Sequence, residues 1–310
     1  MKRILKWTAT LAAGIAVVVA LAWVQNSLAN ESAPGAVTMT ITAVGKKDMA
    51  PPPVRKDDVQ FYLGKERTQV ADWRKGETLY LGILIDDSLD PTIAQQWNDL
   101  KAFMMAQPES TFIAVAYSRN GTAAIAQDFT KDHALAAKAL GMPVGYGGAF
   151  TSPYLALQDW MKRWPDSNER KSILLFSSGI DYFRGTYDPA DPDVDAAIGQ
   201  AQRKNINIWT IYAQDAGHRA RRNYVLFLSQ GFLSRVSEES GAESFYLGYI
   251  PPVTFKPYFD ELQMHLNNQY LLTFVGKSET KPRFVRVRVG TELPDVEFLA
   301  APQAYVRAAK

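Results

Sequence analysis

An apolar run from Leu79 to Ile85 leads directly into Asp86-Asp87-Ser88-Leu89-Asp90, and this junction constrains the fold more than any other feature. A run of this length and composition is typical of a strand that is buried on both faces of a sheet. In an open α/β sheet, ligands bind beyond the carboxyl ends of the strands. Oxygen side chains at i, i+2 and i+4 of one loop can face one hard cation. Asp86, Ser88 and Asp90 have this spacing, so the junction predicts a candidate cation site at the edge of a buried sheet.

Strands and helices alternate after Leu79, which favours parallel strand pairing through helical crossovers. The predicted strands cover residues 79–85, 111–117, 123–129, 172–176, 206–212 and 243–247. Amphipathic helices are predicted after Pro91 and near residues 131–140, 154–164, 193–204 and 222–239. A tight turn at Asn120-Gly121 predicts one antiparallel edge strand. We therefore predict a doubly wound, mostly parallel six-stranded α/β sheet.

The two ends of the chain have a different pattern. Residues 37–44 and 283–289 alternate apolar and polar side chains, which is typical of strands with one buried face. We predict that the N- and C-terminal segments meet in one accessory β layer. The predicted organisation is a signal peptide at 1–29, an N-terminal β segment at 30–75, the α/β domain at 76–250, and a C-terminal helix with a β-hairpin at 251–310.

The first residues have the composition of an export signal. Lys2, Arg3 and Lys6 precede an apolar stretch from Leu11 to Val24, and Ser27-Leu28-Ala29 offers a cleavage site. An uncleaved membrane anchor is the alternative, but spanning a bilayer takes about 20 apolar residues. We therefore expect cleavage after Ala29, a secreted or periplasmic protein, and no stable membrane span afterwards.

The cysteine count and the net charge limit what this protein can be. The chain has no cysteine, so it has neither disulfides nor a lipid-modified cysteine at the signal junction. The formal charge of the whole chain is +2. Residues 1–29 hold three basic residues and no acidic residue, so their removal leaves 31 basic and 32 acidic side chains. This balance argues against a nucleic-acid partner.

The junction at Asp86 resembles the metal-ion-dependent adhesion site of von Willebrand factor A domains, whose first loop reads Asp-x-Ser-x-Ser. The resemblance spans about residues 76–250. Asp86 and Ser88 match the first Asp and the first Ser, and Asp90 stands at the second Ser. Thr151 matches the Thr of the second loop, with Ser152 as the alternative. The family fold and site imply that an acidic residue of a partner protein completes the coordination of the cation.

The clearest departure from the family pattern follows the central strand, where Thr-Asp-Gly becomes Ser177-Ser178-Gly179. Ser178 takes the Asp position and supplies no charge. In one interpretation Asp90 restores the carboxylate with help from Asp181, and the degenerate site holds Mg²⁺ or Ca²⁺. In the other, the polar groups only join the loops by hydrogen bonds. For Asp87, a position facing solvent is expected.

The flanking segments resemble the exported von Willebrand factor A-related proteins of acidobacteria. The matching motifs are Val37-Thr38-Met39-Thr40, Lys56-Asp57-Asp58-Val59 followed by Gly64, and Asn268-Gln269-Tyr270. Each motif is short, and their shared order along the chain carries the resemblance. It implies a domain type and no particular biochemical task.

Other polar features have a simpler explanation. The tract Asp188–Asp195 lacks the glycine and the distal Glu of an EF-hand loop, so we expect a solvated loop with Asp191 or Asp193 capping a helix. The basic segment from His218 to Arg222 could meet an acidic partner, although a flexible loop is the default. His133 and His265 have no metal-ligand spacing, and we expect them to face solvent or to pack.

These features predict a non-enzymatic module that binds a protein on the rim formed by Asp86, Ser88, Asp90, Thr151, Ser178 and Asp181. A periplasmic hydrolase is one alternative, with a conceivable triad of Ser88, His218 and Asp181, although Ser88 lacks the Gly-x-Ser-x-Gly turn that exposes a nucleophile. A structural component of the cell envelope is the other.

Overall fold

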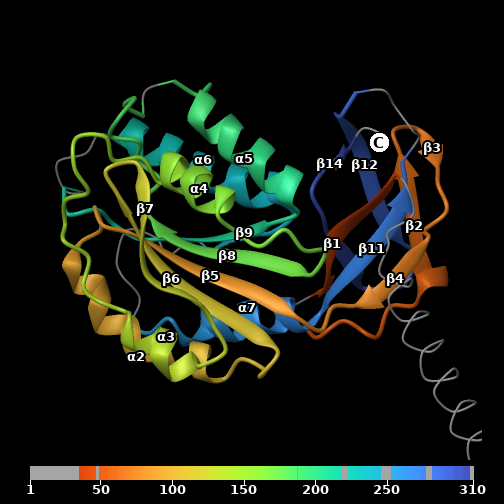
Figure 1. Ribbon diagram of the computed structural model, residues 1–310, viewed down its shortest axis with the longest axis horizontal. Helices are drawn as coiled ribbons and strands as arrows, with labels where there is room; N and C mark the ends of the chain where they lie inside the picture. Colours follow the sequence, from red (N-terminus) through yellow and green to blue (C-terminus); the bar gives the residue numbers. More distant parts are fainter. Residues whose placement is uncertain are drawn as a thin grey trace, which may run out of the picture.

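The computed structural model describes an α/β part and a β part that lie side by side (Figure 1). The described residues are 35–46, 49–186, 188–217, 223–245, 253–276 and 281–307. The segment predicted to be a signal peptide lies outside these ranges. Within them, no helix has both the length and the apolar character needed to cross a membrane.

The α/β part is built on the predicted six-stranded sheet, in the order β10-β9-β8-β5-β6-β7. The strands are β5 (Leu79–Asp86), β6 (Thr111–Arg119), β7 (Thr122–Thr130), β8 (Arg170–Ser177), β9 (Asn207–Tyr212) and β10 (Ser244–Phe245). Only β7 pairs antiparallel, as its tight turn predicted. Asn120 and Gly121 both have a positive φ, which suits the turn of a two-residue hairpin. The last strand was predicted to continue to Leu247, but residues 246 and 247 lie outside the described residues.

Helices cover both faces of this sheet (Figure 1). One face packs against α2 (Trp97–Met105), α3 (His133–Lys138) and α7 (Lys256–Asn267). The other packs against α4 (Pro153–Lys162), α5 (Pro192–Lys204) and α6 (Asn223–Ser240). Because both faces are covered, β5 and β8 are buried along almost their whole length, and their middle residues, 81–85 and 173–176, are apolar or glycine.

The first predicted helix begins differently from the expectation. Residues Pro91–Gln96 form a 3₁₀ helix, η3, and the α-helix α2 starts only at Trp97. Asp90 is the N-cap of η3, and its Oδ1 accepts hydrogen bonds from the amide and the hydroxyl of Thr92. Pro91 at the first helical position suits this start because it has no amide hydrogen to satisfy.

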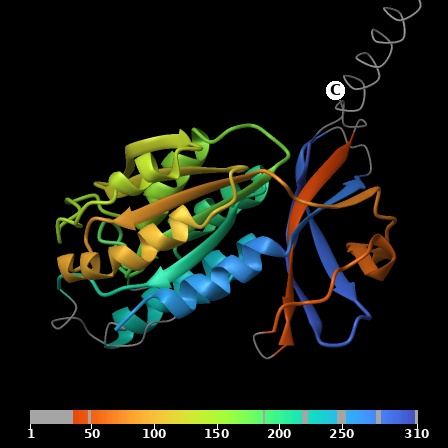
Figure 2. The same cartoon turned by 90° about the horizontal axis from the view of Figure 1, so that it is seen from below.

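The β part is made by both ends of the chain, but it has two sheets where one layer was predicted (Figure 2). The first sheet has the order β13-β1-β11-β4 and the second β14-β12-β2-β3. Their strands are β1 (Ala36–Gly45), β2 (Val59–Leu63), β3 (Glu66–Arg67), β4 (Asp72–Lys75), β11 (Gln269–Val275), β12 (Arg283–Thr291), β13 (Val296–Leu299) and β14 (Gln303–Val306). A shared apolar core joins the sheets, with the rings of Phe61 and Phe274 4.7 Å apart. The extra strands span two to four residues, too short for a clear alternation of side chains.

Candidate functional site

Loops at the carboxyl ends of β5, β8 and β9 meet with the loop that precedes α4. The amide of Tyr182 donates to the carbonyl of Thr151 at 2.9 Å, and the amide of Ala216 donates to the carbonyl of Ser88 at 3.1 Å. Ser88 and Thr151 line the same pocket, of about 120 Å³ and open to solvent, together with Tyr182. The segment 145–148 and Gly217 complete its lining.

Asp86 lies at the base of this rim, at the end of β5, and is fully buried. Its Oδ1 accepts hydrogen bonds from the amide and the hydroxyl of Ser88, at 3.0 and 2.8 Å. Its Oδ2 accepts one from the hydroxyl of Ser177 at 2.7 Å. Burial raises the pKa of Asp86 to about 6, partly opposed by these hydrogen bonds. The carboxylate is thus held by neutral donors in a site that penalises its charge.

After the central strand β8, the serine that contacts Asp86 is Ser177, which the sequence analysis did not select. The predicted residue, Ser178, is equally buried, and its Oγ accepts a long hydrogen bond of 3.4 Å from the amide of Ile180. Strand register explains the difference. Ile85 pairs with Phe176 in the parallel ladder of β5 and β8, so the next residues, Asp86 and Ser177, also lie side by side.

The second loop contributes two adjacent hydroxyls with different roles. Thr151 Oγ1 donates to the carbonyl of Gly148 at 2.7 Å, next to the pocket. Ser152, the alternative to Thr151, is the N-cap of α4 and donates to Asp181 Oδ2 at 2.7 Å. Asp181 Oδ1 accepts hydrogen bonds from the amides of Phe183 and Arg184. Burial raises the pKa of Asp181, which these hydrogen bonds partly oppose. Its contacts tie the second loop to the loop after β8.

Two acidic residues of the first loop have partners that the sequence did not predict. Asp90 was proposed to restore a cation ligand, and the structure places its Oδ1 on the first turn of η3. Asp87 was expected to face solvent, but its side chain is only 1 % exposed and its Oδ2 contacts the Nε of Arg119 at 2.6 Å. The expectation for Asp87 is wrong because Arg119, at the end of the neighbouring strand β6, reaches the carboxylate and compensates its charge.

Asp215 is a further acidic residue of this region that the sequence analysis missed. It is buried after β9, and its Oδ2 accepts hydrogen bonds from the hydroxyl of Tyr182 and the amide of Gly217. Leu89 forms a β-bridge with Asp215, which fixes the first loop against this one. The sequence did offer a signal for Asp215: like Asp86, it is an acidic residue close to the carboxyl end of a predicted strand.

The donor set suits a weakly held, hydrated cation. Ser88 Oγ and Thr151 Oγ1 donate their hydrogens to protein oxygens, so their lone pairs can face a cation in the pocket they share. The negative charge comes from Asp86, behind Ser88. Mg²⁺ usually keeps several waters and uses one or two carboxylates, whereas Ca²⁺ takes about 6–8 oxygen ligands. The residues at the pocket therefore fit a hydrated Mg²⁺ better than Ca²⁺.

Exposed aromatic side chains lie beside this pocket. Tyr146, which lines it, is 69 % exposed, and Phe150, next to Thr151, is 55 % exposed. Phe183 from the loop after β8 is 44 % exposed, and its ring lies 5.5 Å from that of Phe150. Clustered exposed apolar side chains on a protein surface mark interaction sites. The arrangement combines a polar pocket with an apolar border.

The acidic residues between positions 181 and 193 have nearby partners in the protein. Asp191 caps α5, as predicted, through the amides of Asp193 and Val194. Carboxylate oxygens of Asp181, Asp191 and Asp193 lie within 4.8 Å of one another, but Asp193 is paired with Arg184. His218 and the basic segment after it lie outside the described residues.

The comparisons with known proteins give likenesses of low similarity. No protein-family model matches the sequence, and no curated protein matches it. Among solved structures, the chain is similar to a von Willebrand factor type A protein from Catenulispora acidiphila, with 13% identity, a TM-score of 0.43, and coverage of 90% of this chain and 74% of that one. It is also similar to an aerotolerance-related membrane protein from Bacteroides fragilis, with 13% identity, a TM-score of 0.42, and coverage of 61% and 98%. A third is the ArnB paralog VWA2 from Sulfolobus acidocaldarius, with 8% identity, a TM-score of 0.40, and coverage of 89% and 76%.

Proposed function

We propose that this chain is an exported module that binds a partner protein at the pocket of Ser88 and Thr151. The observation that carries the proposal is the convergence of both residues on one solvent-open pocket with exposed aromatic rings beside it. Tyr146 and Phe150 offer apolar contact area at little entropic cost, and the hydroxyls offer polar contacts. A partner that presents an acidic side chain among apolar ones would match this chemistry.

A divalent cation is the second part of the proposal. Ser88 and Thr151 would hold a hydrated Mg²⁺ in front of the negative charge of Asp86, and the ion would supply positive charge for the partner's acidic group. A cation in the pocket would favour the charged form of Asp86, which burial otherwise penalises. The buried carboxylate of Asp86 would favour a cation at this place, and the partner's carboxylate would bind the same ion.

We further infer that the rim binds without catalysis. The hydroxyl of Ser88 donates to Asp86, a residue fixed in β5, and the loop lacks the strained turn that exposes a nucleophile. His133 on α3 and His265 on α7 lie on the sheet face opposite to α4, and the third histidine, His218, lies outside the described residues. Ester or glycan turnover that disappears in Ser88→Ala would contradict this inference.

Site-specific photo-crosslinking in cells tests the binding surface. A photo-reactive phenylalanine at Tyr146 or Phe150 should give one discrete protein adduct. The matched positions are Arg286 and Arg288, which are exposed on β12 of the β part and should give no such adduct. Adducts confined to β12 would instead favour a structural role with the β part as docking surface, and adducts at neither place would refute capture at the rim. Fractionation of the same cells tests export.

A further inference from the structure

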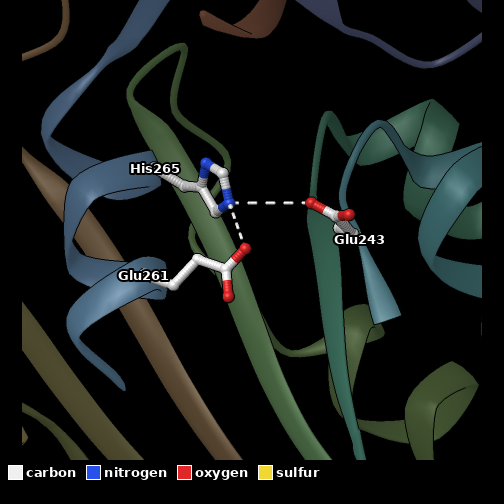
Figure 3. A group of neighbouring side chains, drawn as sticks. All are labelled: Glu243, Glu261 and His265. Atoms are coloured by element: carbon white, nitrogen blue, oxygen red, sulfur yellow. Dashed lines mark ion pairs between the residues drawn. The ribbon is translucent and has the colours of Figure 1, made fainter. Parts of the chain in front are cut away.

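Three side chains with metal-ligand chemistry meet at the edge of the central sheet, away from the rim (Figure 3). Glu261 and His265 stand one helical turn apart on α7 and therefore share a face of that helix. Glu243 immediately precedes β10. Because alternate residues of an extended strand point to the same side, Glu243 points to the face on which Phe245 packs, which is the face that α7 covers. We call Glu243, Glu261 and His265 the α7 cluster.

The distances in the α7 cluster suit a small divalent ion. His265 Nε2 lies 3.6 Å from Glu243 Oε2 and 3.8 Å from Glu261 Oε1. One ligand atom from each residue lies within 4.8 Å of the other two. Nitrogen and oxygen ligands bind Zn²⁺ at about 2.0–2.2 Å, which in a tetrahedron puts neighbouring ligand atoms roughly 3.3–3.5 Å apart. Movements of a few tenths of an ångström would bring both carboxylates to this separation from the imidazole.

The imidazole is held in place while the carboxylates remain accessible. His265 is 2 % exposed, and its ring stacks on Trp209, with centroids 5.3 Å apart and an angle of 11° between the planes. The side chains of Glu243 and Glu261 are 47 % and 36 % exposed. A fixed nitrogen ligand between two solvent-accessible carboxylates gives an ion both a preformed contact and a route of entry.

We propose that the α7 cluster is a binding site for Zn²⁺ or a chemically similar divalent transition-metal ion. Imidazole favours ions such as Zn²⁺, whereas Mg²⁺ and Ca²⁺ prefer sites made of oxygen alone. Three protein ligands leave a fourth position, which water would fill. The ion would join α7 to the start of β10, so it would hold an edge strand that pairs with β9 through two residues.

Isothermal titration of Zn²⁺ into the full chain tests the proposal. We expect one ion per chain in the wild type and much weaker binding of Mg²⁺ at this site. Glu243→Gln and Glu261→Gln keep the shape of each side chain and remove its charge. Loss of partners that only support a metal ligand already costs about 10–100-fold in affinity, so each variant should weaken Zn²⁺ binding at least about tenfold.

The matched control is Asp260→Asn, which removes an exposed carboxylate from the same helix, where it pairs with Lys256. It should leave Zn²⁺ affinity unchanged. Asp86→Asn should also leave it unchanged, because Asp86 lies at the rim. No Zn²⁺ binding by the wild type would overturn the proposal and would mean that the carboxylates only pair with the imidazole. Equal binding by the wild type and both Gln variants would also overturn it, since the ion would then be held elsewhere.

Discussion

The rim and the α7 cluster both gather ligand atoms from distant parts of the chain, but they treat their carboxylates in opposite ways. At the rim, Asp86 is fully buried, and hydrogen bonds from Ser88 and Ser177 reach both of its oxygens. In the α7 cluster the buried member is an imidazole, and Glu243 and Glu261 reach solvent. The difference teaches that burial decides which groups of a polar cluster stay open to solvent: hydroxyls beside a pocket at the rim, and carboxylates in the α7 cluster.

The largest expected effect comes from neutralising Asp86. Its pKa is 3.8 in the reference state and about 6 in the folded protein, so the unfolded chain releases the proton first as the pH rises. Stability is therefore lost between these two values, by about 3 kcal/mol in all. We expect the free energy of unfolding of Asp86→Asn to exceed that of the wild type by about 3 kcal/mol at pH 7.5. At pH 3.5, where the carboxyl is mostly protonated in both states, the two values should be nearly equal. Denaturant unfolding across this pH range measures the difference.

The control for this experiment is Asp90→Asn. Asparagine is as good an N-cap as aspartate, so the start of η3 should keep its stability at either pH. Saturating Mg²⁺ should reduce the advantage of Asp86→Asn at pH 7.5 if the rim holds the ion, because the ion stabilises only the wild-type carboxylate. A variant that is less stable than the wild type at pH 7.5 without Mg²⁺ would show that the hydrogen bonds outweigh the cost of burial, and the comparison with the α7 cluster would fail.

A smaller difference in stability is expected between substitutions of the adjacent residues Ser177 and Ser178. Ser177→Ala removes a donor to Asp86 and an acceptor for the amide of Gly179, both buried, so it should lower the free energy of unfolding by about 1–3 kcal/mol. Ser178→Ala removes only the long contact with Ile180 and should cost less than about 1 kcal/mol. Denaturant unfolding at pH 7.5 compares the two variants. The reverse order would assign the supporting role to Ser178, as the family pattern predicted.

The sequence predicted the sheet because burial on both faces leaves long apolar runs such as that from Leu79 to Ile85. It predicted only part of the rim. Motif position suggested Ser178, whereas the register of β5 and β8 brings Ser177 to Asp86. Asp90 has the right spacing for a ligand, but a helix start at Pro91 gives its carboxylate a local partner. Side-chain direction at a loop depends on such competing local contacts, which spacing alone does not reveal.

The β part and the α7 cluster show a second limit. The short strands β3, β4, β13 and β14 have too few residues for a readable alternation, so one layer was predicted where two sheets form. Glu261 and His265 have a helical spacing that is visible in the sequence. Glu243 reaches them only because β10 pairs beside β9, and that contact between distant segments has no local signature.

The smallest effect is expected from the carboxylates of the α7 cluster in the absence of metal. Glu243 and Glu261 are partly exposed, so water screens much of the interaction of each carboxylate with His265. Glu243→Gln and Glu261→Gln should each change the free energy of unfolding by less than about 1 kcal/mol in metal-free buffer, far less than Asp86→Asn at the same pH. With saturating Zn²⁺, the wild type should gain more thermal stability than either variant, because a ligand stabilises the state that binds it in proportion to the logarithm of its affinity. A loss above about 2 kcal/mol without metal would mean that the carboxylates hold His265 in place as part of the fold, and the two sites would then differ less than their exposure suggests.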